Sequence, residues 1–121
     1  MAIWVPPAAA PQSPFFNLTT TTDNLTATSS GSQATSLLLG SVGNRITTVA
    51  VAADSVLMPP SVAGAWMVVI NAAAANSMNV FPAVGDAINA VAANGAFAIA
   101  ANKTVLFYCI TAGRWHTILT A

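Results

Sequence analysis

The sequence predicts an all-β fold: an antiparallel β-sandwich or jelly-roll-like domain that follows an extended, proline-rich N-terminal arm. Between residues 64 and 119, short apolar runs are each ended by turn-forming residues, such as Asn94-Gly95 and the segment 111–114. Asn-Gly is the strongest short hairpin signal, because both residues tolerate positive φ. The run 104–110 is apolar on both alternating faces, which is typical of a strand buried on two sides. Together these patterns indicate a β meander.

Residues 1–16 differ from the rest of the chain and are expected to form the arm. Four of the seven prolines lie here, at positions 6, 7, 11 and 14. Proline fixes φ and removes a backbone donor, so an extended, polyproline-like conformation is favoured. A floppy terminus is the alternative. Because large aromatic side chains are costly to leave in water, we expect three of them to anchor the arm on a neighbouring subunit: Trp4, Phe15 and Phe16.

The β domain is expected to span residues 17–121. Its first part is rich in Thr, Ser, Asn and Gly, with short β-type patches at 18–22, 25–28 and 36–39. A better alternating strand covers 44–51, and a short run at 56–58 ends at Pro59-Pro60, because proline cannot donate to a ladder. The main block predicts six further strands: 65–70, 78–81, 87–91, 96–100, 104–110 and 115–119. A helix over 87–101 is the competing interpretation, but Asn94-Gly95 lies at its middle.

Charge is unusually scarce. Only 5% of the 121 residues are charged, against roughly a quarter in a typical soluble chain, while 55% are hydrophobic. A surface with so few charges is poorly protected against association, so we expect a homo-oligomer. Three basic residues do not make a nucleic-acid interface. No apolar run is long enough for a membrane span, and the first residues do not resemble a secretory signal.

No residue pattern predicts catalysis or a bound cofactor or metal. His116 with Asp86 and a serine could be imagined as a triad, but no Gly-x-Ser-x-Gly turn is present. Cys109 lies in an apolar strand without a basic neighbour, so it is expected to be a buried hydrophobe. Five aromatic residues are expected mainly to fill the core: Trp66, Phe81, Phe97, Phe107 and Trp115.

Several segments carry a resemblance to a known class of proteins: 58–60 (MPP), 64–71 (GAWMVVIN), 80–82 (VFP), 85–89 (GDAIN), 103–109 (KTVLFYC) and 113–115 (GRW). In this order the pattern resembles a β-rich module of tailed-bacteriophage virion proteins, over residues 57–119. Such modules look like those of capsid decoration (cement) proteins and of head or tail fibres, typically as trimers. The resemblance implies a virion protein without an active site.

The expected function is therefore that of a phage capsid decoration protein on the virion surface, a homotrimer that binds the major capsid protein and stabilises the head. Three arms per trimer would raise avidity although each contact is weak. The alternative is a fibre or receptor-binding domain that recognises host glycans through Arg114, Trp115 and His116. A Thr-rich ice-binding surface is a third hypothesis, but the threonines show no regular spacing.

Overall fold

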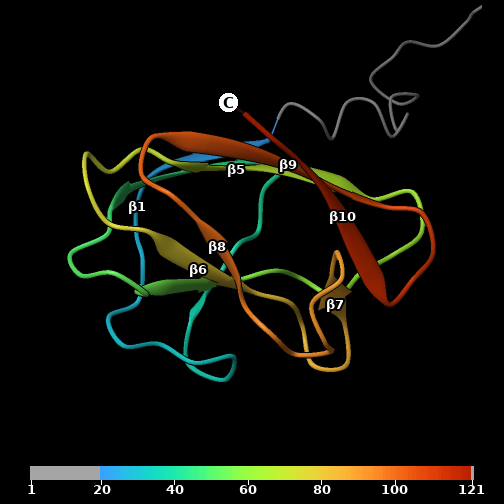
Figure 1. Ribbon diagram of the computed structural model, residues 1–121. Coiled ribbons are helices and arrows are strands. Elements are labelled where there is room, and N and C mark those ends of the chain that lie inside the picture. Colours follow the sequence, from blue (N-terminus) through green and yellow to red (C-terminus); the bar gives the residue numbers. More distant parts are fainter. Residues whose placement is uncertain (1–19, 121) are drawn as a thin grey trace, which may run out of the picture.

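The computed structural model describes residues 20–120, and in this part of the chain all regular structure is β-strand, so the expected all-β class is confirmed. The strands form two sheets (Figure 1). In spatial order, sheet A contains β1 (Thr21–Thr26), β3 (Gly43–Thr48), β5 (Trp66–Asn71), β9 (Lys103–Cys109), β10 (Arg114–Leu119) and β7 (Ala87–Ile88). Sheet B contains β2 (Leu37–Leu38), β4 (Ser55–Leu57), β6 (Met78–Phe81) and β8 (Phe97–Ile99). No helix that could cross a membrane occurs among residues 20–120.

The first six strands wind as a β-solenoid. The chain passes alternately from sheet A to sheet B, and each new strand pairs in parallel with the previous strand of its own sheet, in the orders β1-β3-β5 and β2-β4-β6. Gly43 pairs with Thr21 on one side and with Val68 on the other, so three coils stack in sequence order. Two parallel strands need a long crossover connection between them. Here each connection contains one strand of the opposite sheet.

The last four strands depart from this parallel winding. β8 pairs antiparallel with β6, and β9 pairs antiparallel with β5. β10 returns antiparallel to β9 through a hairpin, and β7 pairs in parallel with β10 at the edge of sheet A. Strand β9 therefore lies between β5 and β10, near the centre of sheet A (Figure 1).

The predicted antiparallel sandwich or jelly-roll is corrected by this topology. Two sheets do face each other across one core, but consecutive strands mostly belong to opposite sheets and do not form hairpins. Asn94-Gly95 does turn the chain, with Asn94 at φ 68°, yet it joins a strand of sheet A to a strand of sheet B. The helix alternative for 87–101 is wrong, because this segment contains β7 and β8. The arm, residues 1–16, lies outside the described residues.

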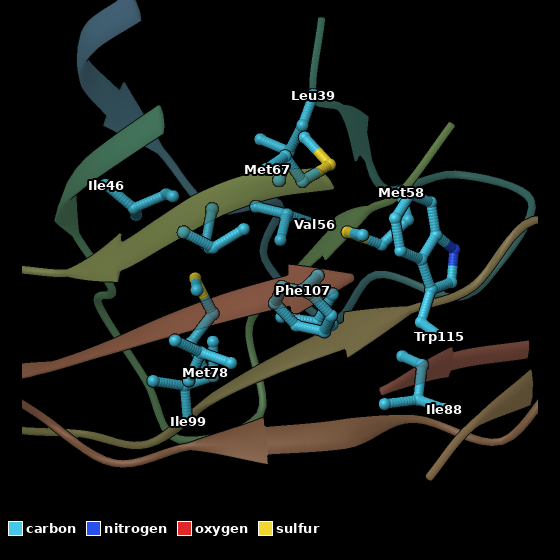
Figure 2. Packing of buried hydrophobic residues seen from close by; sticks show 14 of the residues in the cluster. Leu39, Ile46, Val56, Met58, Met67, Met78, Ile88, Ile99, Phe107 and Trp115 are labelled. Carbon is cyan, nitrogen blue, oxygen red and sulfur yellow. The ribbon is translucent and has the colours of Figure 1, made fainter. Parts of the chain in front are cut away.

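The core fills the space between the two sheets (Figure 2). Strand β5 shows the period-two pattern that produces it, because Met67, Val69 and Asn71 are buried while the residues between them are half-buried. Phe107 packs edge-to-face against Trp115, with ring centroids 6.4 Å apart. The largest side chains that are almost fully buried include Trp115, Phe107, Leu39, Ile46, Met58, Met78, Ile88 and Ile99.

Asparagine occupies most of the described non-glycine positions with positive φ, at corners between strands and, for Asn24, at a register shift within β1. Five of the seven described non-glycine residues with positive φ are asparagines: Asn24, Asn76, Asn89, Asn94 and Asn102. Asparagine tolerates the left-handed region better than most residues. At Asn76 the side chain also donates to the carbonyl oxygens of Val49 and Ala50, at 2.9 and 3.1 Å. The high asparagine content thus reflects a fold with many tight corners.

Gly31 is required by a close approach in the loop between β1 and β2. A Cβ placed on Gly31 would clash with Ser55 Oγ and would lie 2.8 Å from Ser36 Oγ. These two buried hydroxyl groups are hydrogen-bonded to each other at 2.5 Å. We expect Gly31→Ala to lower the free energy of unfolding by about 1–3 kcal/mol, because an extra methyl group forces this packed pair apart. Urea unfolding measures the change.

Gly40→Ala is the matched control, because a Cβ at Gly40 meets nothing within 4 Å. It should change the unfolding free energy by less than about 0.5 kcal/mol. Equal effects of the two substitutions would contradict the packing explanation.

Candidate functional site

The residues considered for catalysis are dispersed. Within residues 20–120 no three His, Cys, Asp or Glu side chains lie together in a group that could hold a metal ion. Cys109 is buried and its thiol donates to Thr111 O at 3.3 Å, while the exposed His116 projects from the opposite face of sheet A. The carboxylate of Asp86 accepts a hydrogen bond from the backbone N–H of Ser61 at 2.8 Å. Cys109 and Asp86 therefore each have a structural hydrogen-bond partner.

The acidic residues mainly fix loops. Buried Asp54 accepts hydrogen bonds from Ser30 N and Val51 N, at 3.3 and 3.0 Å. Exposed Asp23 forms an ion pair with Arg45 at 2.9 Å, and this hydrogen bond lowers the pKa of Asp23 from its ordinary 3.8. A lowered pKa in the folded state means that the contribution of the pair to stability is present above pH 4 and is lost as the pH falls through the folded-state pKa. Because both groups are exposed, this contribution is small.

The solvent side of sheet A is a surface feature that the residues discussed above do not explain. Cross-strand register places Tyr108 between Trp66 and His116, and Leu106 between Val68 and Ile118. These partners share one face, because paired residues on neighbouring strands project to the same side. We call this the outer face, and define it by Trp66, Val68, Ile70, Leu106, Tyr108, His116 and Ile118.

The outer face is apolar and poorly covered. Ile118 is 69% exposed and Tyr108 is 39% exposed, and Trp66, Val68, Ile70 and Leu106 are half-buried. No formal charge lies on β5. The charged residues beside this surface are Lys103 at the first position of β9, Arg114 at the first position of β10, and Arg45, which pairs with Ile70 from the neighbouring strand β3. Contiguous exposed apolar surface of this kind is typical of a protein interface. The sequence predicts that the run 104–110 is buried on both faces, in a sandwich or at a subunit interface. In the structure Val105, Phe107 and Cys109 of β9 are buried, whereas Leu106 is half-buried and Tyr108 is exposed.

A pocket of about 380 Å³ opens where β3 and β5 begin and where β2 and β4 have ended. We call it the Trp115 pocket. Its lining carries no charged residue and includes Thr20, Leu39, Pro59, Pro60, Trp66 and Trp115. Trp115 is 1% exposed, and its Nε1 is the one buried side-chain nitrogen or oxygen in the described part of the chain that has no hydrogen-bond partner.

The residues predicted for glycan recognition are not brought together. Trp115 projects into the core, whereas Arg114 and His116, its neighbours on β10, are exposed on the other side. Both border a second, open pocket of about 540 Å³ formed with residues 110–113. Arg114 donates to the carbonyl oxygen of Asn89. The aromatic partner of His116 is Tyr108, through cross-strand pairing, rather than Trp115.

The predicted arm anchors Trp4, Phe15 and Phe16 lie outside the described residues. Sequence reasoning missed Trp66, Tyr108 and Ile118 as one surface, because they come from three strands far apart in the chain. The available signal was the second apolar face of the run 104–110, which is compatible both with a sandwich core and with a subunit interface.

Comparison of the chain with protein-family models, with curated proteins and with solved structures finds no match.

Proposed function

We propose that this chain is a structural protein of a phage virion, a capsid decoration protein that self-associates and binds the capsid without catalysing a reaction. The observation that carries the proposal is the outer face, an apolar surface spread over β5, β9 and β10. The scarcity of charge supports it, because little electrostatic repulsion opposes association. The phage setting and the major capsid protein as partner rest on the sequence resemblance alone.

Association through the outer face would remove several large side chains from water at once. Burying apolar surface contributes about 25 cal/mol per Å², so a few such side chains are enough for a weak contact. Repetition of that contact in an oligomer, and again on a capsid lattice, multiplies the avidity. A decoration protein needs the avidity of many repeated contacts more than it needs one strong contact. A homotrimer remains the expected state, and Trp4, Phe15 and Phe16 remain the expected anchors on neighbouring capsid subunits.

The oligomeric state tests the role of the outer face. Light scattering of the full-length protein should give a mass near three times 12.2 kDa. Ile118→Lys should weaken association by about 30-fold or more, because it places a charge at the most exposed apolar residue of the outer face. Val84→Lys is the matched control, since Val84 is 83% exposed and lies outside the outer face. A monomeric wild type, or an unchanged mass for Ile118→Lys, would contradict the interface.

Co-sedimentation with empty phage heads then tests the function itself. The wild type and Val84→Lys should sediment with heads built from the major capsid protein of the phage that encodes the chain. A protein that forms the expected oligomer but stays in the supernatant would not be a decoration protein.

A receptor-binding fibre domain is the second candidate, favoured by one observation. Trp66, Tyr108 and His116 form a cross-strand row on the outer face, and aromatic faces are suited to stacking on sugar rings. Binding of the protein to intact host cells, abolished by Tyr108→Ala and absent from empty heads, would favour this function over decoration.

A further inference from the structure

The indole N–H of Trp115 is a buried donor without an acceptor. An unpaired buried donor costs free energy that a suitably placed carbonyl oxygen would recover. The ring cannot easily turn to find another partner, because it packs edge-to-face against Phe107 at an interplanar angle of 89°. In Figure 2 the indole nitrogen lies on the edge of the ring turned away from Phe107. Trp115 also lines the Trp115 pocket, so an occupant of this pocket contacts the indole ring that carries the unpaired donor.

The walls of the pocket indicate the chemistry of its occupant. Pro59, Pro60 and Trp66 offer flat apolar surfaces, and no lining residue is charged. An uncharged, extended polypeptide rich in proline fits these walls. In the polyproline II conformation the backbone makes no internal hydrogen bonds, so its carbonyl oxygens are free to accept. Grooves lined by aromatic residues commonly recognise such segments with the spacing Pro-x-x-Pro.

The chain itself contains such a segment a few residues before Thr20. Thr20 forms part of the wall, and the preceding residues include Pro11-Gln12-Ser13-Pro14 followed by Phe15-Phe16. Five residues lie between Pro14 and Thr20, and an extended chain over these six residue steps reaches about 20 Å. A tether of this length gives a local concentration in the millimolar range, which favours the segment of the same chain over that of another copy.

We propose that the Trp115 pocket binds residues 11–16 of its own chain, with a backbone carbonyl oxygen of this segment accepting the hydrogen bond of Trp115 Nε1. The prolines pack against Pro59, Pro60 and Trp66, and the aromatic pair Phe15-Phe16 is withdrawn from water. The inference concerns the free subunit and does not depend on the proposed function. It assigns the pocket as a site for a proline-rich peptide.

The test follows the indole N–H signals of the full-length protein by NMR. The three tryptophan signals are assigned with Trp4→Phe and Trp66→Phe. In the double variant Pro11→Ser/Pro14→Ser, the Trp115 signal should shift and its hydrogen exchange should become about tenfold faster, because the segment loses its fit to the pocket. Pro6→Ser/Pro7→Ser is the matched control, since it removes two prolines of the arm outside the binding segment and should leave the Trp115 signal unchanged.

A mixing experiment distinguishes the protein's own segment from that of another copy. Isotope-labelled Pro11→Ser/Pro14→Ser protein is mixed with an excess of unlabelled wild type. The Trp115 signal should remain that of the variant if the segment acts within its own chain. Recovery of the wild-type signal would overturn binding within one chain in favour of exchange between copies. An unchanged Trp115 signal in Pro11→Ser/Pro14→Ser, or equal changes in both double variants, would overturn the peptide site altogether.

Discussion

Replacing Phe107 with alanine should lower the free energy of unfolding by about 3–5 kcal/mol. Phe107 is fully buried on β9, and its ring packs edge-to-face against both Phe97 and Trp115, at 6.1 and 6.4 Å between centroids. Phe97 belongs to sheet B and Trp115 to sheet A. Truncation therefore leaves a cavity between the two sheets that neither neighbour can fill without moving the other. Urea unfolding at fixed protein concentration measures the loss.

Two other substitutions separate this core effect from general effects on β9. Phe107→Leu keeps most of the volume and should lose less than half as much stability as Phe107→Ala. Tyr108→Ala changes the next residue, which projects to the outer face and is 39% exposed in the single chain, so in the Ile118→Lys background, where association is weakened, it should cost less than about 1.5 kcal/mol. A loss at Tyr108 equal to that at Phe107 would mean that the outer face is buried in the state measured.

The position of most strands was predictable, whereas their pairing was not. Alternation in Trp66–Asn71 and the apolar run of Lys103–Cys109 mark strands wherever they lie. However, Asn94 at positive φ is compatible both with a hairpin and with a corner that leads to the opposite sheet. The spacing of strands and turns is the same in the two cases. Only contacts between distant segments, such as the pairing of β5 with β9, distinguish them.

The candidate site was harder to predict than the fold for the same reason. The row of Trp66, Tyr108 and His116 exists because register brings three strands together, and no local pattern specifies that register. One local rule was nevertheless sufficient at residues 114–116. Since neighbouring residues in a strand project to opposite faces, Trp115 and the pair Arg114 and His116 could have been separated from the sequence alone, before β10 was placed in its sheet.

Asn71 is the polar residue on which the core depends most directly. It is fully buried at the end of β5, and its side-chain amide donates to Asn76 O and Ile99 O at 3.1 and 2.9 Å. Its Oδ1 accepts from the backbone N–H of Ala73 at 3.2 Å. Ile99 belongs to β8 in sheet B, so this one side chain links the two sheets and fixes the turn that follows β5.

Asn71→Ala should lower the free energy of unfolding by about 2–4 kcal/mol, because it leaves buried backbone groups without partners. Asn79→Ala, at a half-buried position of β6 outside this network, should cost less than about 1 kcal/mol in the same urea titration.

Asn71→Asp gives a sharper test, because it keeps an acceptor for Ala73 N and replaces the amide donor by a carboxyl group facing two carbonyl oxygens. Burial and these oxygens raise the pKa of that carboxyl group above its unfolded value. The variant should therefore be most stable below pH 4 and should lose stability as the pH rises towards 7, relative to wild type at each pH. If the difference in unfolding free energy between Asn71→Asp and wild type did not change with pH, the carboxyl group would be in contact with water. Residue 71 would then not form a buried connection between the two sheets.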